Sequence, residues 1–158
     1  MAIDQKAAEI AQISCRLTKA CLTKEEVFSS RFNLTAGEFK MLKLFSNDDV
    51  LPVKYLIEEL NLTPGRITHL LTSLERKKLV TRKRHKEDKR VALVGLTAKS
   101  RQFVSMLLEE HVALHQEIMN QMSPKQIDSV MTALELFLKA MNNWTDRLKA
   151  TTNPKKHR

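Results

Sequence analysis

The sequence predicts a mainly α-helical fold that contains one small β-hairpin. Only three glycines and four prolines occur in the 158 residues, so few positions favour sharp turns. Apolar side chains recur at steps of three and four along most of the chain, which is the spacing of helices with one buried face. The pattern changes between residues 79 and 96, where two strand-like runs flank a charged stretch. These observations place helices on both sides of a single hairpin.

The first part of the chain predicts three helices. Apolar spacing places the first over residues 3–28. The second should begin at residues 35–38 (Thr-Ala-Gly-Glu), which have the spacing of a capping box, and end at residues 47–49 (Asn-Asp-Asp). Pro52 fits the first turn of the third helix, where a missing N–H costs nothing.

A short turn then leads into a fourth helix and the hairpin. Thr63 is the expected N-cap and Pro64 the first helical residue, and the helix should end near Lys77. One face is apolar and the opposite face is polar or basic. Residues 79–82 and 91–96 read as strands around a charged loop. Two helices joined by a tight turn and followed by a basic hairpin predict a winged helix-turn-helix.

Two further helices are expected after the hairpin, over residues 97–122 and from a capping box at residues 123–126 onward. The last helix carries the clearest apolar stripe in the chain, which is not expected to stay in water. We therefore expect residues 1–30 and 98–150 to form a helical dimerisation region of a homodimer, and residues 31–97 to form the winged helix-turn-helix domain. Residues 151–158 read as a basic disordered tail.

The charge distribution predicts a polyanionic partner. The formal net charge is +9, and residues 66–90 alone hold ten Lys or Arg and three acids. A basic cluster of this kind is the footprint expected for a phosphate backbone, and double-stranded DNA is the expected partner. The sequence contains no Gly-rich phosphate loop, no nucleophile elbow and no carboxylate pair in a plausible pocket, so we expect no enzyme and no cofactor. The absence of a secretory signal or long apolar run predicts a cytoplasmic protein without membrane contact.

The fourth helix and the hairpin are expected to contact DNA in different grooves. The major groove admits one α-helix, so the polar face of the fourth helix should read bases. An arginine at the tip of the hairpin can enter the minor groove, with Arg90 and Lys86 as candidates. The expected contacts from the helix are Thr63, Arg66, Thr68, His69, Thr72 and Ser73, and those from the wing are Arg84, Lys86, Lys89 and Arg90.

Asp88 is an acid in this otherwise basic loop, and a structural role explains it best. A carboxylate can hold a turn by accepting backbone hydrogen bonds, or it can orient a neighbouring arginine. Arg90 is the first expected partner of Asp88, and Arg82 is the second.

Residues 74–82 (LERKKLVTR), 87–90 (EDKR) and 93–97 (LVGLT) resemble the MarR family of bacterial transcriptional regulators. Residues 32–35 and 38–42 are similar to the family's lead into its second helix, so the resemblance covers about residues 32–100. It implies a dimer held by the terminal helices, with one wing per protomer. It also implies a repressor released by a small-molecule effector or an oxidant.

The sequence departs from the family at two positions. Lys78 stands where the family usually has the glycine that caps the helix in a left-handed conformation, which costs a lysine about 1 kcal/mol. Lys86 lies near a position where the family often has proline. The helix exit is therefore expected to differ, and the wing to be more mobile.

Two groups of residues are candidates for a sensor. His111 and His115 lie four apart on one helix, so they can share a metal, but no full ligand set is visible, and two polar residues at a dimer or interdomain seam explain them better. Cys15 is a candidate redox site beside Arg16, but Cys15 and Cys21 also fit small residues packed in a helix interface.

Three functions remain open at this point. The first is a sequence-specific, dimeric regulator of the MarR type, with repression as the expected mode. The second is a non-specific or architectural DNA-binding protein, or a metal- or oxidant-sensing regulator of the same fold. The third is a protein-interaction module whose last helix binds another partner.

Overall fold

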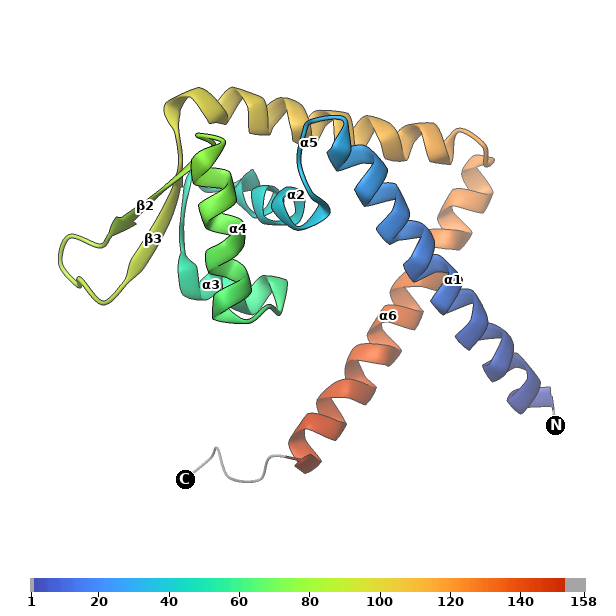
Figure 1. The fold of residues 1–158 in the computed structure, drawn as a ribbon. Helices are drawn as coiled ribbons and strands as arrows, with labels where there is room; N and C mark the ends of the chain where they lie inside the picture. Colours follow the sequence, from blue (N-terminus) through green and yellow to red (C-terminus); the bar gives the residue numbers. More distant parts are fainter. Residues whose placement is uncertain (1, 153–158) are drawn as a thin grey trace. The chain divides into compact units, whose positions relative to one another are not determined.

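The computed structural model describes residues 2–152, and in this part of the chain the mainly helical prediction is confirmed. Helices and strands follow one another as expected, with one short strand that the sequence did not predict (Figure 1). The elements are α1 (Ala2–Ser30), α2 (Ala36–Lys43), the 3-10 turn η1 (Leu44–Ser46), β1 (Val50–Pro52), α3 (Val53–Leu60), α4 (Pro64–Arg76), β2 (Val80–Arg84), β3 (Ala92–Leu96), α5 (Ala98–Met119) and α6 (Pro124–Thr152).

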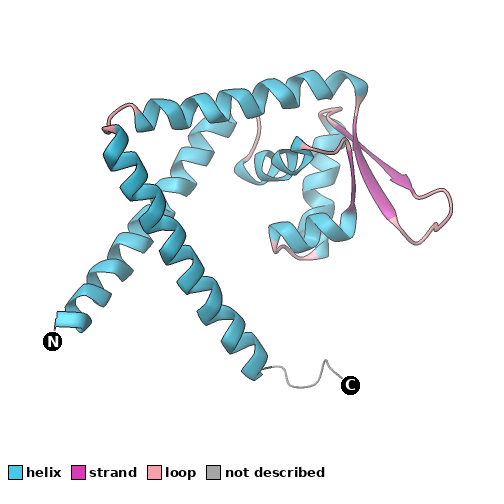
Figure 2. Ribbon diagram, turned by 180° about the vertical axis from the view of Figure 1, so that it is seen from behind, coloured by secondary structure: helices cyan, strands magenta, loops and turns pink. Residues whose placement is uncertain are grey.

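The three strands form one antiparallel sheet in the order β1-β3-β2 (Figure 2). The expectation that Pro52 begins a helix was wrong by one position, because Pro52 ends β1 and has the extended backbone (ψ 141°) of the residue that precedes α3. A proline is compatible with β1 because β1 lies at an edge of the sheet, where one side of the strand needs no partner. A strand of three residues leaves too short a pattern to be recognised in the sequence.

The predicted helix starts are confirmed by their side-chain caps. The Thr35 hydroxyl accepts a hydrogen bond from the Glu38 backbone N–H at 3.2 Å, and Glu38 Oε2 accepts one from the Thr35 N–H at 2.7 Å. Thr63 caps α4 by accepting from the Arg66 N–H at 3.4 Å. Ser123 and Gln126 form the same reciprocal pair before α6.

The helix ends differ from the predictions in three places. The second helix stops at Lys43 and continues as the tighter turn η1, because Phe45 has a non-helical backbone. The fifth helix stops at Met119 rather than at residue 122. The last helix runs to Thr152, so the first two residues of the expected disordered tail are helical, and residues 153–158 of that tail lie outside the described residues.

The chain divides into two compact units, Met1–His111 and Val112–Arg158. The first unit contains the helices and the sheet of the predicted DNA-binding domain, packed around one apolar core. Its largest fully buried side chains include Phe39, Met41, Leu42, Leu56, Ile67, Leu71, Leu74 and Leu107. The core face predicted for the fourth helix is confirmed, because all four of its apolar residues are at most 4% exposed.

The long terminal helices expose much apolar surface. Along α1, Ile3, Ile13 and Val27 are each more than half exposed. Along α6 the exposed apolar side chains are Val130, Met131, Leu134, Leu136, Phe137, Leu138, Met141, Trp144 and Leu148. Among the described helices, none is long and apolar enough to cross a membrane.

Candidate nucleic-acid interface

A short turn joins α3 to α4, the helix predicted to read bases. Asn61 adopts a left-handed backbone (φ 50°) directly after α3, and the chain re-enters a helix at Pro64. The core face of α4 is buried, whereas Arg66, Thr68, His69 and Thr72 are exposed. The N-cap Thr63 is exposed beside them. A helix held by one face and free on the other can enter a major groove.

The hydroxyls on this exposed face are committed to the helix backbone. Thr68 Oγ1 donates to the Pro64 carbonyl at 2.9 Å, and Thr72 Oγ1 donates to the Thr68 carbonyl at 2.9 Å. Each threonine therefore keeps a methyl group but has no hydroxyl proton left to donate, and Thr72 Oγ1 also accepts from Arg82 Nη2 at 3.3 Å. These groups suit contact with a thymine methyl or a base amino group better than with a base acceptor.

Ser73 differs from the other predicted contacts of this helix because it is half-buried. Its hydroxyl donates a hydrogen bond to the carboxyl of Glu38, a residue that is 1% exposed. Burial by itself raises the pKa of Glu38, but hydrogen bonds from Lys77, the Thr35 backbone and Ser73, together with the charge of Lys77, bring that pKa below its ordinary value. Ser73 is thus engaged inside the protein, and a contact with DNA by Ser73 remains a prediction.

Lys77 joins the end of α4 to the segment before α2. Its Nζ donates to the Asn33 carbonyl at 2.6 Å and to Glu38 Oε2 at 2.7 Å. Lys77 was expected only to mark the end of the fourth helix and to belong to the basic segment, so this pair was not predicted. The capping-box position of Glu38 was visible in the sequence, but nothing in the pattern indicated that a lysine 39 residues later would reach it.

The wing is the hairpin of β2 and β3, and its loop is exposed from residue 85 to residue 90 (Figure 1). The loop closes through hydrogen bonds from His85 N–H to the Val91 carbonyl at 2.9 Å and from Val91 N–H to the Asp88 carbonyl at 3.0 Å. The side chains of Arg84, Lys86, Lys89 and Arg90 are all exposed around it. The end of β2 and the loop therefore present these four cations to the solvent, and their contact with DNA remains a prediction.

Asp88 holds the turn in the first of the two ways considered. Its Oδ1 accepts the backbone N–H of Arg90 at 2.9 Å, so the first expected partner is found, although through the backbone and not through the guanidinium. The second expected partner, Arg82, lies on Glu75 instead, with Nη2 2.5 Å from Glu75 Oε2. Arg82 is the third residue of β2 and lies beside the last turn of α4, where it binds Glu75 and not Asp88.

The exit of α4 has the left-handed backbone expected of a glycine cap, although a lysine stands there. Lys78 has φ 61°, and the Leu79 N–H donates to the Leu74 carbonyl at 3.0 Å, as in a glycine-capped helix end. The expectation that this exit would differ was therefore wrong, and the chain accepts the strain of a left-handed lysine at an exposed position.

The candidate sensor residues do not belong to a metal-binding cluster within the described part of the chain. The His111 ring packs edge-on against Phe28 and Phe39, at centroid distances of 5.4 and 5.0 Å. Among the described residues, no group of three His, Cys, Asp or Glu side chains is arranged to hold a metal ion, so His111 and His115 lack further ligands there. Cys15 and Cys21 are both exposed on α1 and are not bonded to each other.

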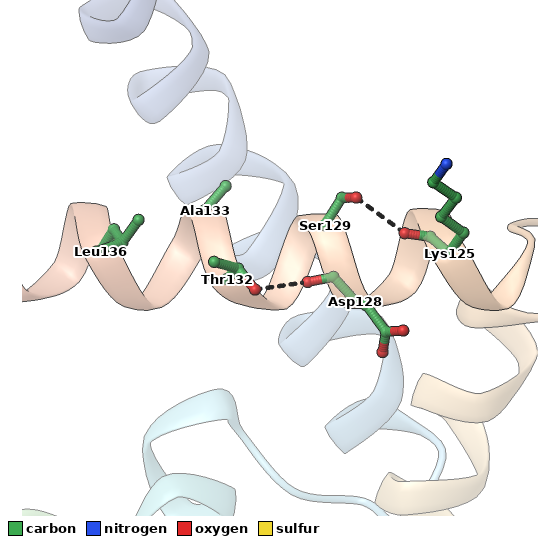
Figure 3. Close-up of a pocket in the computed structure, with 6 residues that line it drawn as sticks. All are labelled: Lys125, Asp128, Ser129, Thr132, Ala133 and Leu136. Carbon is green, nitrogen blue, oxygen red and sulfur yellow. Dashed lines mark hydrogen bonds between the residues drawn. The ribbon is translucent and has the colours of Figure 1, made fainter.

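A shallow depression on α6 offers no built ligand site. It is lined from one helix by Lys125, Asp128, Ser129, Thr132, Ala133 and Leu136 (Figure 3). Its two hydroxyls are occupied, because Ser129 Oγ donates to the Lys125 carbonyl and Thr132 Oγ1 to the Asp128 carbonyl, each at 2.9 Å.

Comparison with known proteins agrees with this geometry. The profile of the MarR family matches residues 34–92, from just before α2 to the first residue of β3. The transcriptional regulator SarZ of Staphylococcus aureus is 28% identical over 130 residues, which are 82% of this chain and 86% of SarZ. The organic hydroperoxide resistance transcriptional regulator of Bacillus subtilis is 37% identical over 67 residues, which are 42% of this chain and 46% of that regulator.

Solved structures extend the likeness to the whole fold. FabT of Streptococcus pneumoniae, crystallised in complex with DNA, matches with a TM-score of 0.73 and 25% identity over 87% of this chain and 99% of FabT. A mutant of MarR from E. coli complexed with operator DNA matches with a TM-score of 0.70 and 21% identity over 84% of this chain and 96% of MarR. Order of elements, sequence profile and fold therefore agree: residues 34–92 match the MarR family, and the chain is similar over most of its length to MarR-type winged helix-turn-helix transcriptional regulators.

Proposed function

We propose that this protein binds double-stranded DNA in a sequence-specific manner as a homodimer and represses transcription where it binds. The observation that carries the proposal is that the exposed row of α4 and the basic loop of the wing belong to one compact unit. The helix supplies short polar groups and Arg66 for base edges, and the wing supplies cations for phosphates and a minor groove. The DNA complexes of FabT and MarR support the same use of the fold.

The exposed apolar surface of α1 and α6 supports assembly as a dimer. Monomeric proteins rarely leave such contiguous apolar surface in water, and six of the exposed residues of α6 recur at steps of three and four from Val130 to Leu148. We assign residues 1–30 and 98–150 to dimerisation and residues 31–97 to DNA binding. A two-fold dimer would place two copies of α4 about 10 base pairs apart, or a multiple of that, along one face of a duplex.

The test is selection of bound genomic fragments by the purified full chain, followed by footprinting on the best fragment. A sequence-specific dimer gives a sharp footprint on a pseudo-palindrome. An architectural protein gives uniform protection whose extent grows with protein concentration. Placing the protected site between a promoter and a reporter distinguishes repression from activation.

A second candidate concerns release from DNA by an oxidant. Cys15 is an exposed thiol beside Arg16 on α1, and one relative of this chain is named for organic hydroperoxide resistance. Oxidation by peroxides requires a thiol that the oxidant can reach, and Cys15 is exposed. If this candidate holds, a hydroperoxide releases wild-type protein from DNA but not the Cys15→Ser variant. Cys21→Ser is the matched control, because Cys21 is an exposed thiol on the same helix, and it should respond like the wild type.

A further inference from the structure

Glu75, in the last turn of α4, binds Arg82 of β2 through both carboxylate oxygens. Oε2 lies 2.5 Å from Arg82 Nη2, and Oε1 accepts the backbone N–H of Arg82 at 3.1 Å. The pKa of Glu75 lies below its ordinary value, and the hydrogen bond from Arg82 is the main cause. The Glu75 carboxylate therefore stays ionised. Neither residue is fully exposed, with side-chain exposures of 30% for Glu75 and 38% for Arg82.

The position of Arg82 in the sheet explains why this contact is available. β2 lies at the edge of the sheet and pairs only with β3, with Arg82 opposite Val94. The N–H of Arg82 points out of the sheet and would need water or another partner. Glu75 supplies that partner from the recognition helix. Among the described residues, all the hydrogen bonds between α4 and β2 are made by Arg82.

The same guanidinium reaches the exposed face of the recognition helix. Arg82 Nη2 lies 3.3 Å from Thr72 Oγ1, and the Thr72 hydroxyl already donates to the Thr68 carbonyl. Arg82 therefore connects the wing strand with one of the residues expected to meet bases.

We propose that Glu75 and Arg82 form a brace that fixes the wing relative to the recognition helix, so that base reading by α4 and flank contact by the wing act as one unit. This inference rests on the proposed sequence-specific binding of DNA. Arg82 is then a positioning residue, with its charge directed at Glu75 and not at a phosphate. The brace lies at the third residue of β2, before the loop that carries the exposed cations, and therefore sets the direction in which that loop leaves the domain.

Glu75→Ala tests the brace because electrostatics and positioning predict opposite signs. Removing an acid beside a DNA-binding face should by itself tighten binding. Losing the brace should instead weaken binding to the preferred site by roughly tenfold, because the contacts of α4 and of the wing are coupled through it. Glu87→Ala is the matched control, because Glu87 is an exposed acid of the same hairpin. Equal or tighter binding by both variants would overturn the proposal.

Coupling between the two DNA-contacting parts gives a second readout that a loss of stability alone would not change. In the wild type, the losses from His69→Ala and Arg90→Ala should be non-additive, because the brace makes one contact depend on the other. In the Arg82→Lys background, which keeps the charge but loses the planar guanidinium, the two losses should become additive. Unchanged non-additivity in that background contradicts the brace. Glu75→Gln, which keeps an acceptor for Arg82, should recover most of the affinity that Glu75→Ala loses.

Amide hydrogen exchange without DNA separates failure of the brace from failure of the proposed function. Glu75→Ala should speed exchange at the Arg82 amide and leave the amide of Leu96, which is bonded to the Asp49 carbonyl, unchanged. If the wild type binds all DNA equally but this exchange difference appears, the brace exists and sequence-specific binding is wrong. If the wild type prefers one site and Arg82 exchange is unaffected by Glu75→Ala, the brace is wrong.

Discussion

Helix α4 and the wing both present exposed polar or basic side chains to the solvent, yet the protein holds them in different ways. Helix α4 is fixed by four apolar side chains that are at most 4% exposed. In β2 only Val80 is buried, and the strand is exposed from Thr81 to Arg84. The loop of the wing is closed by its own hydrogen bonds around His85, Asp88 and Val91.

This difference matches two ways of reading DNA. Hydrogen bonds to base edges require atoms placed within tenths of an ångström, so the element that makes them needs a packed core beneath it. A cation in a minor groove responds to the electrostatic potential, which tolerates small displacements. We therefore expect substitutions under α4 to act on folding, and substitutions in the wing to act on affinity.

The largest expected effect is on stability, from Leu74→Ala. Leu74 is 0% exposed under α4, and truncation of a buried leucine to alanine typically costs 2–5 kcal/mol. Denaturant unfolding at pH 7 measures the loss. Arg90→Ala, in the exposed loop, is the matched comparison and should change the free energy of unfolding by less than about 0.5 kcal/mol. Equal losses in the two variants would remove the distinction between the two regions.

The next effect concerns the buried ion pair that holds the end of α4. Replacing Glu38 with Gln should cost roughly 3 kcal/mol, because Lys77 would keep a partly buried charge without its carboxylate. The folded-state pKa of Glu38 is lowered, so its contribution is fully present above the ordinary value of 4.5 and is lost as the pH falls through the folded-state value.

The pH dependence of that pair can be measured by urea unfolding between pH 7 and pH 3. The wild type should lose stability more steeply than Glu38→Gln as the pH falls below 4.5, because only the wild type has a Glu38 carboxylate to protonate. Glu58→Gln is the control, since Glu58 is 61% exposed and makes only a surface pair with Lys54. Parallel acid limbs for the wild type and Glu38→Gln would contradict the assignment.

A third effect separates the two regions by how they bind DNA. Arg90→Ala should weaken binding to most sequences, reduce the dependence of affinity on salt by about two ions per dimer, and remove a preference for A·T-rich flanks. Arg66→Ala or His69→Ala should instead relax specificity at defined base pairs, by roughly 1–3 kcal/mol per lost contact. A salt titration and a base-by-base substitution scan measure both. If Arg90→Ala leaves affinity, salt slope and flank preference unchanged, the wing does not contact DNA.

How much of this could be predicted from the sequence also differs between local and long-range features. Capping at Thr35, Thr63 and Ser123 was predictable because each cap lies three residues from its partner and has a fixed spacing. The core face of α4 was predictable because its period matches a helix.

Contacts between elements were not predictable in the same way. The pairs Glu38–Lys77 and Glu75–Arg82 join separate elements, and no period in the sequence connects their members. Strand β1 was missed because its three residues pair with β3, more than forty positions later, and carry no alternation of their own. The left-handed exit of α4 was expected to change with Lys78, yet the hydrogen bonds around Leu74 and Leu79 outweigh the preference of one residue.

The smallest expected effect lies at that exit, where α4 turns into the wing. Lys78 has φ 61°, a conformation that costs a side chain other than glycine about 1 kcal/mol. Lys78→Gly should therefore raise the free energy of unfolding by up to about 1 kcal/mol, although glycine also gains freedom in the unfolded chain. Lys83→Gly, at an exposed residue inside β2, is the comparison and should lower stability.

Loss of stability in Lys78→Gly would mean that the lysine side chain makes a contact that outweighs its backbone strain. If Lys78→Gly is more stable but binds DNA more weakly at low salt, Lys78 is a phosphate contact that the protein keeps at the expense of stability.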